Sequence, residues 1–154
     1  MKFTSRQDTD LSVDQLFSMM SDFDRIERIL VRRGTEVTRL DGRSETGVGL
    51  GWQFGFDWKG KHRLLRLAVQ RFERPNLIEM QGESELFEIS VIEEFIALTR
   101  NKSRLRMIIE IRPRNMRGRL LLQTARLAKG QLDRKFDKRI SELIGEARRS
   151  HAGG

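Results

Sequence analysis

The chain has 154 residues, of which 38% are hydrophobic and 34% are charged, and its formal net charge is +8. This length fits one domain with a sizeable core. No apolar run reaches the ~18 to 20 residues that span a bilayer. The polar N-terminal segment lacks the apolar core of a secretory signal. Because the chain contains no Cys, disulfides, thiolate nucleophiles and Cys-ligated metals are excluded. We therefore expect one soluble, cytoplasmic domain over residues 1–150, followed by a disordered tail at 151–154.

The positive charge lies in the last third of the chain. Residues 1–111 contain 18 Lys or Arg and 18 Asp or Glu, whereas residues 112–154 contain 12 and 4. The first segment is therefore neutral, and the second carries the whole net charge of +8.

The chain opens with a weak strand candidate and two short helices. Residues 2–9 are rich in Ser and Thr and include one aromatic residue. Ser12 and Gln15 have capping-box spacing at the start of an amphipathic segment. Asp22 can cap a second short helix, which Gly34 is well placed to end.

From residue 35 the apolar pattern changes from a helical period to a period of two. Short turns separate successive strand candidates, and such a series is typical of an antiparallel meander. The strand candidates are residues 35–40, 49–58, 61–72, 77–82, 86–98 and 104–112. Together with the opening strand they predict a sheet of six to seven strands.

After Pro113 the helical period returns and persists. The apolar residues that recur every three or four positions are Leu121, Ala125, Ala128, Leu132, Phe136, Ile140, Leu143 and Ala147. They form a single stripe along a helix of roughly 30 residues, or about 45 Å. A helix of this length with one apolar side needs a long apolar surface, and a curved sheet provides one.

The stretch GVGLGWQFGFDWKGK at residues 47–61 raises the question of a phosphate-binding loop. The dinucleotide fingerprint fails, because aromatic residues occupy the position of its last glycine. A P-loop spacing ends at His62, where Ser or Thr should bind magnesium, and no helix follows. We therefore reject phosphate binding here.

The same stretch alternates large rings with small or polar residues. The residues of one parity are Leu50, Trp52, Phe54, Phe56 and Trp58, and Gly, Gln and Asp occupy the other. Since successive side chains of a strand point to opposite faces, one face is a wall of rings and the other is nearly bare. Glycines at bare positions let a strand bend. The stretch predicts the lining of a concave sheet, either as solid core or as the wall of a ligand cavity.

One strand, two short helices, a curved meander and a long terminal helix make the order of the helix-grip fold. In this order of elements the whole chain resembles bacterial members of the START-like (SRPBCC) superfamily, of the polyketide cyclase/dehydrase and lipid-transport type. The stretches that carry the resemblance are VDQLFSMMSDFDRIERILVRRGTEV, GVGLGW, LRMIIEIRP and RLLLQTARLAKGQLDRKFDKRI. The resemblance implies an α+β fold with a curved antiparallel sheet wrapped on the C-terminal helix. It also implies a cavity that holds an apolar or amphipathic small molecule. It does not imply one activity, since the superfamily includes carriers, cyclases, hormone receptors and chaperone or ribosome partners.

We predict that inward residues of the sheet and of the helix stripe line this cavity. The ligand-binding candidates are Trp52, Phe54, Phe56, Leu65, Leu67, Phe87, Val91, Glu93, Met107, Ile109, Leu121, Ala125, Ala128 and Leu132. No metal or cofactor is expected, because two His residues without Cys do not make a metal cluster.

Catalysis is the weaker hypothesis. The chain has no Tyr and only two His, of which His151 lies in the predicted tail and His62 follows a hairpin turn, where we expect a solvated side chain. No nucleophile–base pair is visible, and we assign no catalytic residue. We therefore favour a non-catalytic or weakly catalytic binder over a cyclase- or dehydratase-type enzyme.

Glu93 is the one carboxylate on the apolar parity of its strand. If it points inward, burial raises its pKa, and the side chain can act as an acid or base or orient a ligand. A bulge at Glu93 and Glu94 would instead turn both side chains to solvent, as bulges often do in curved sheets. We favour the bulge.

The basic C-terminal helix has more than one interpretation. We favour a solvated outer face whose Arg and Lys stems cover sheet edges. The alternative is an interaction protein that binds an anionic partner, either a membrane surface or RNA. Sequence-specific nucleic-acid recognition is not expected, because the helix has no exposed aromatic residues for base stacking. Neither the ligand nor the oligomeric state follows from the sequence.

Overall fold

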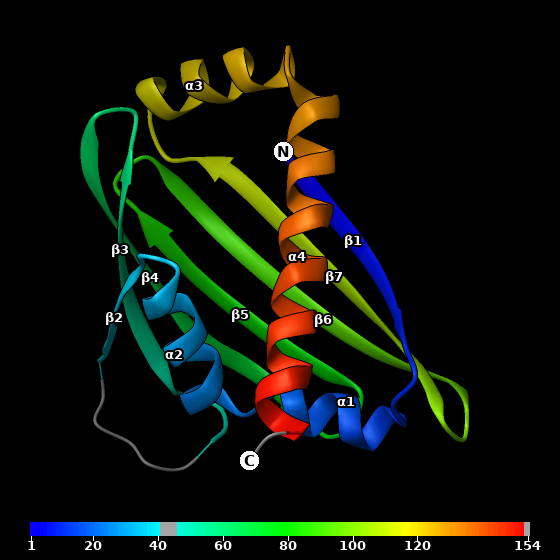
Figure 1. Cartoon of the computed structure of the whole chain (residues 1–154). Helices are drawn as coiled ribbons and strands as arrows, with labels where there is room; N and C mark the ends of the chain where they lie inside the picture. The colour runs from blue at the N-terminus through cyan, green and yellow to red at the C-terminus, as the bar shows by residue number, and fades with distance from the viewer. Residues whose placement is uncertain (41–45, 153–154) are drawn as a thin grey trace.

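The computed structural model describes residues 1–40 and 46–152 of the chain. A seven-stranded antiparallel sheet curves around one long helix, and its strands run in the order β1-β7-β6-β5-β4-β3-β2 (Figure 1). The strands are β1 (Lys2–Thr9), β2 (Glu36–Arg39), β3 (Gly51–Trp58), β4 (Lys61–Glu73), β5 (Leu77–Ser84), β6 (Phe87–Thr99) and β7 (Lys102–Pro113). The helices are α1 (Val13–Met20), α2 (Phe23–Arg32), α3 (Met116–Arg126) and α4 (Lys129–Ala152). The predicted α+β helix-grip architecture is confirmed.

The two short helices begin at the predicted caps. The backbone amide of Gln15 donates to Ser12 Oγ at 3.2 Å, and the amide of Ser12 donates to Gln15 Oε1 at 3.0 Å. These two bonds make a capping box, which satisfies amides at the start of α1. The Asp22 side chain accepts from the amide of Arg25 at the start of α2. Gly34, with a φ of 95°, follows α2 in the left-handed region that glycine favours.

The C-terminal segment forms two helices where the sequence predicts one. The backbone amide of Leu127 donates to the Thr124 carbonyl, and the amide of Ala128 donates to the Ala125 carbonyl, which closes a tight turn between α3 and α4. Helix α3 crosses one end of the sheet, and α4 runs along the concave face (Figure 1). The apolar stripe continues through the turn because α3 and α4 both pack against the same sheet, so its period does not mark the bend. Helix α4 extends to Ala152, into the predicted tail, and residues 153–154 lie outside the described residues.

The core lies between the concave face of the sheet and helices α1, α2 and α4. Phe17 of α1 makes edge-to-face contacts with Phe72 and Phe95 of the sheet, at centroid distances of 5.2 and 4.9 Å. On the other side of the core, Ser5 Oγ of β1 donates to Asp137 of α4 at 2.7 Å. Buried apolar contacts and this hydrogen bond hold α4 in the hollow of the sheet. Within the part of the chain that is described, no helix is long and apolar enough to cross a bilayer.

Candidate ligand-binding site

Two apolar cavities lie on the concave side of the sheet. The first, here called the α2 cavity, has a volume of about 170 Å³. Its lining residues are Met20, Phe23, Ile26, Glu27, Leu30, Trp52, Phe54, Leu67, Met80, Val91, Glu93, Met107 and Leu143. The second, here called the α3 cavity, has a volume of about 360 Å³. Its lining residues are Met1, Phe3, Trp58, Lys59, Phe87, Ile111, Leu121, Leu122, Thr124, Ala125, Ala128 and Leu132.

The Glu27 carboxylate fixes the orientation of one ring that lines the α2 cavity, the indole of Trp52. Trp52 Nε1 donates to Glu27 Oε1 at 2.6 Å, and Arg39 Nε donates to the same oxygen at 2.5 Å. The indole ring of Trp52 is stacked at 26° to the ring of Phe54 and meets Phe23 edge-on. A charge-assisted hydrogen bond to a carboxylate is stronger than a neutral one, so Glu27 holds the indole in one orientation against the cavity.

Helices α2 and α4 close the α2 cavity from the side opposite the sheet. Arg33 at the end of α2 donates to Glu142 of α4 at 3.1 Å and also contacts Glu146. Leu143 lies on the intervening turn of α4 and lines the cavity. This bridge joins the two helices beside the α2 cavity.

Glu93 points into the α2 cavity. Its side chain is 4% exposed and stands opposite Ile78 on β5 and Met107 on β7. The pairing of β6 is continuous through Glu93 and Glu94, so the predicted bulge is wrong. Only Glu94 turns outward, where it pairs with Arg106 at 3.5 Å.

The surroundings of Glu93 supply no counter-charge. Burial raises the pKa of Glu93 to about 8. Within residues 1–40 and 46–152, no hydrogen bond or ion pair joins its carboxyl group to another side chain. At neutral pH the group is therefore a carboxylic acid, with one O–H donor and acceptor oxygens that face an apolar space.

The α3 cavity is built from one face of α3 and the far end of the sheet. Asn115 caps α3 by accepting from the amide of Gly118 at 2.9 Å, and its Nδ2 donates to the Glu85 carbonyl at 3.2 Å. A Cβ at Gly118 would lie 2.3 Å from the Leu86 carbonyl oxygen. Glycine at this position therefore lets α3 pack directly on the turn between β5 and β6.

Trp58 and Lys59, at the tip of the β3–β4 hairpin, form part of the rim of the α3 cavity. Two cations contact the Trp58 ring, with Lys59 Nζ at 5.1 Å and the Arg63 guanidinium at 5.2 Å from its centroid. Among the described residues, the buried Nε of Arg63 has no hydrogen-bond partner. The rim is therefore cationic, whereas the interior is apolar.

The predicted site residues are divided between the two cavities. Those lining the α2 cavity are Trp52, Phe54, Leu67, Val91, Glu93 and Met107. Those lining the α3 cavity are Phe87, Leu121, Ala125, Ala128 and Leu132. Ile109 packs against the core, and the partly buried Leu65 lines neither cavity. Phe56 is exposed near the tip of the β3–β4 hairpin, and it lines a separate hollow with Trp58.

Sequence reasoning missed the contribution of the short helices and of the first strand. Phe23, Ile26 and Leu30 of α2 and Phe3 of β1 line the cavities. In the sequence Phe23, Ile26 and Leu30 recur at helical intervals, but this period does not indicate which part of the sheet they face. His62 is exposed, as predicted, and its hydrogen bond with Asp57 raises its pKa.

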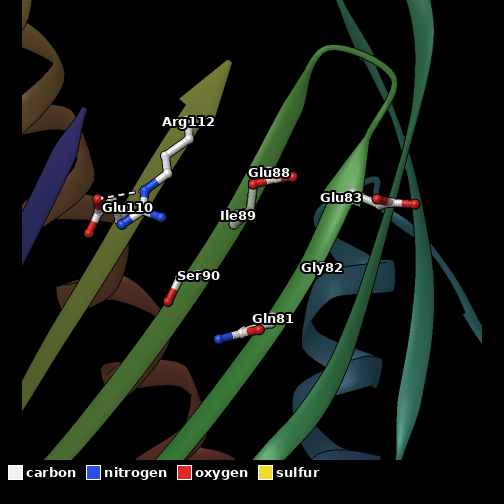
Figure 2. Close-up of a pocket in the computed structure, with 8 residues that line it drawn as sticks. All are labelled: Gln81, Gly82, Glu83, Glu88, Ile89, Ser90, Glu110 and Arg112. Carbon is white, nitrogen blue, oxygen red and sulfur yellow. Dashed lines mark hydrogen bonds and ion pairs between the residues drawn. The ribbon is translucent and has the colours of Figure 1, made fainter. Parts of the chain in front are cut away.

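A larger hollow of about 450 Å³ lies on the face of the sheet turned away from the helices (Figure 2). Apart from Gly82 and Ile89, its lining residues are polar or charged, and Glu110 forms an ion pair with Arg112 at 3.0 Å. Three carboxylates and an arginine do not match an apolar ligand. In the described part of the chain, no group of three or more His, Asp or Glu side chains is placed to hold a metal ion.

No family model matches the sequence, and no curated protein matches it. Solved structures do match the fold. A protein from Thermus thermophilus has a TM-score of 0.72 at 10% identity, over 97% of this chain and 99% of its own. A Streptomyces aromatase/cyclase has a TM-score of 0.69 at 14% identity, over 100% of this chain and 98% of its own. A START superfamily protein from Mycobacterium smegmatis has a TM-score of 0.57 at 13% identity, over 92% of this chain and 98% of its own.

The chain therefore has the helix-grip fold, with apolar cavities on the concave face of its sheet. The helix-grip fold is the one that START-like proteins share, as the sequence resemblance predicts. At these identities the likeness establishes the fold and no particular activity.

Proposed function

We propose that residues 1–150 act as a single cytoplasmic domain that binds a hydrophobic or amphipathic small molecule, such as a lipid, a polyketide or another aromatic compound. The observation that carries this proposal is the pair of apolar cavities between the sheet and the helices. The α3 cavity, at about 360 Å³, is of the usual size for ligand pockets, roughly 300–1,000 Å³. The fold shared with an aromatase/cyclase and a START superfamily protein supports the same proposal.

Glu93 narrows the chemistry of the ligand. A buried polar group without a partner costs free energy, which a hydrogen bond recovers. A carbonyl, ether or hydroxyl oxygen that reaches the α2 cavity can accept from the protonated carboxyl group. We therefore expect an apolar ligand with an oxygen acceptor near one end.

A cyclase or dehydratase is less well supported. Glu93 can serve as an acid, but acid–base chemistry also needs a base near the same substrate atoms. The other carboxylate of the α2 cavity, Glu27, is already bound to Arg39 and Trp52. Binding without turnover fits this arrangement better.

The only two tryptophans of the sequence allow the two cavities to be probed separately. Trp52 lines the α2 cavity, and Trp58 lines the α3 cavity. In a Trp52→Phe variant, we expect the apolar dye N-phenyl-1-naphthylamine to quench Trp58 emission saturably by energy transfer. Native mass spectrometry of freshly purified protein should detect a retained apolar molecule.

Cavity-filling variants provide the control. Ala125→Phe places a ring in the α3 cavity and should weaken dye binding about tenfold, equivalent to about 1.4 kcal/mol. Ala97→Phe adds the same ring at an exposed position of β6 and should leave the dye affinity unchanged. Equal affinities in the two variants, or no saturable binding to the folded protein, would contradict the proposal.

A further inference from the structure

Helix α3 carries a second apolar stripe, on the side turned away from the α3 cavity. Met116, Leu120 and Leu127 are 64%, 55% and 91% exposed. At 3.6 residues per turn the three side chains fall within about 40° of one another, and Leu127 continues the helix because its backbone is in the right-handed helical region. The opposite side of the helix is the one that packs on the protein, through Gly118, Leu121, Leu122 and Ala125. Single exposed apolar residues are ordinary, whereas a contiguous stripe marks an interaction surface.

Arginines border this stripe on both sides. By the same helical geometry Arg117 lies along one edge, and Arg119 and Arg126 lie along the other. All three are exposed. The sequence contains no Asp or Glu between residues 114 and 132. In the described residues, Arg117 approaches Glu85 at 4.0 Å, and no ion pair involves Arg119 or Arg126.

The stripe adjoins the larger apolar cavity. Helix α3 crosses the end of the molecule that lies away from α1 (Figure 1), and the inner face of the same helix lines the α3 cavity. The rim beside it carries the exposed Trp58 and Lys59 at the hairpin tip. Helix α3 thus separates the exposed apolar stripe from the α3 cavity.

We propose that α3 docks on an anionic lipid bilayer, with Met116, Leu120 and Leu127 inserted at the boundary between headgroups and acyl chains. Arg117, Arg119 and Arg126 contact lipid phosphates, in the arrangement typical of interfacial amphipathic helices. The ring of Trp58 beside them suits the interface, where aromatic residues with a polar edge concentrate. The docking proposal depends only on the features of α3. That the α3 cavity then exchanges its ligand with the bilayer rests on the proposed function.

Two other occupants fit the surface less well. A second copy of the chain would bring arginines from both copies together, with no carboxylate on the stripe to pair with them. RNA would pair with the arginines but would leave three apolar side chains without a partner, and α3 presents no ring for base stacking. An anionic bilayer matches both the apolar stripe and its charged borders.

The test is co-sedimentation of the whole protein with vesicles. We expect binding to vesicles of phosphatidylglycerol and phosphatidylcholine, and little binding to phosphatidylcholine alone, because the arginines need anionic lipid. Leu120→Gln combined with Leu127→Gln should lower the partition coefficient at least about tenfold. Arg119→Gln combined with Arg126→Gln should lower it by a similar factor at low salt.

Matched controls use exposed residues elsewhere. Ile96→Gln with Leu98→Gln removes exposed apolar side chains from the other end of the sheet, and Arg139→Gln with Arg148→Gln removes exposed charges from α4. Both pairs should bind vesicles like the wild type. In the Trp52→Phe background, docking should shift Trp58 emission to the blue.

Several results would overturn the docking proposal. These are an absence of binding to anionic vesicles, an equal loss in the control pairs, or binding that the leucine substitutions leave unchanged. A concentration-dependent dimer dissolved by Leu127→Gln would replace the bilayer with a second copy, and RNA retention lost only with the arginines would replace it with RNA. Dye binding by the same variants in solution separates the two proposals: docking lost with dye binding kept leaves the proposed function standing.

Discussion

Replacing Gly82 with Ala is expected to lower the free energy of unfolding by about 3 to 5 kcal/mol, among the largest effects of a single substitution. Gly82 of β5 stands opposite Leu67 of β4. A Cβ added to Gly82 would lie 1.6 Å from the carbonyl oxygen of Arg66 and 2.9 Å from the Cα of Leu67. Both are backbone atoms, so the contact can be relieved only if β4 and β5 separate.

Gly130→Ala provides the matched control. Gly130 lies in α4, and a Cβ there would meet only the flexible end of the Arg134 side chain, at 3.5 Å. Because glycine is less favourable than alanine in a helix and Gly130 lies in the first turn of α4, this change should raise stability by at most about 0.5 to 1 kcal/mol. Urea unfolding of both variants measures the two effects. A Gly82→Ala protein as stable as the wild type would mean that the strands do not approach this closely.

The close approach at Gly82 also bears on the site. Leu67 and Met80, next to it on the paired strands, both line the α2 cavity. The close approach of β4 to β5 therefore sets the spacing of two strands that line this cavity. We therefore expect that a folded Gly82→Ala protein would have an altered α2 cavity.

The overall fold could be predicted because each step depends on local chemistry. The capping box at Ser12 and Gln15 marks the start of α1, and the change of period at residue 35 marks the start of the sheet. The alternation of rings predicts that Trp52 and Phe54 face inward, as the structure shows. These signals need only the residues themselves and their spacing.

The cavities depend on the distances between helices and strands in the folded protein, and the spacing of residues along the sequence does not give these distances. The stripe from Leu121 to Ala147 keeps its period through the turn at Leu127, so the bend that creates the α3 cavity is invisible in the pattern. Phe56 follows the correct parity but lies near the tip of the β3–β4 hairpin and is exposed. Whether an inward face is solid or hollow is decided by how far each helix stands from the sheet.

Glu93 illustrates a conflict between two rules. Parity predicts an inward side chain, whereas the cost of a buried carboxylate favours a bulge that turns it outward. Pairing with β5 and β7 on both sides holds the register of β6 and prevents the bulge. The free-energy cost of burying Glu93 is reduced because its carboxyl group is protonated. The sequence alone does not reveal this protonation, because it depends on the surroundings of the side chain in the folded protein.

Glu93→Gln is expected to change how stability depends on pH. A Glu in the unfolded chain ionises near its ordinary pKa of 4.5, whereas burial raises the folded pKa to about 8. Between these values the folded state binds more protons than the unfolded state, so wild-type stability falls as pH rises, by about 1.4 kcal/mol per unit. The loss between pH 5 and pH 8 should amount to about 3 to 4 kcal/mol. The neutral Gln variant should lack this loss, match the wild type near pH 5 and exceed it at pH 8.

Glu94→Gln is the control, because it makes the same change at the next residue on the outer face of β6. Glu94 pairs with Arg106 at 3.5 Å in a partly exposed setting, so its loss should alter stability by less than about 1 kcal/mol. The difference between the Glu93→Gln and wild-type curves, measured by urea unfolding from pH 5 to pH 8, isolates the buried group. Parallel curves would contradict an inward, protonated Glu93.

Ligand binding should respond to the same proton. If a ligand oxygen accepts from the protonated carboxyl group, ionisation of Glu93 removes the donor and places a charge beside the bound oxygen. Wild-type affinity for the retained ligand should therefore fall as pH rises above the folded pKa of about 8. In Glu93→Gln the amide N–H remains a donor at every pH, so the affinity should be nearly constant from pH 6 to pH 9. Native mass spectrometry at both ends of this range would show the bound fraction falling in the wild type alone, whereas a parallel decline in both proteins would place the ligand away from Glu93.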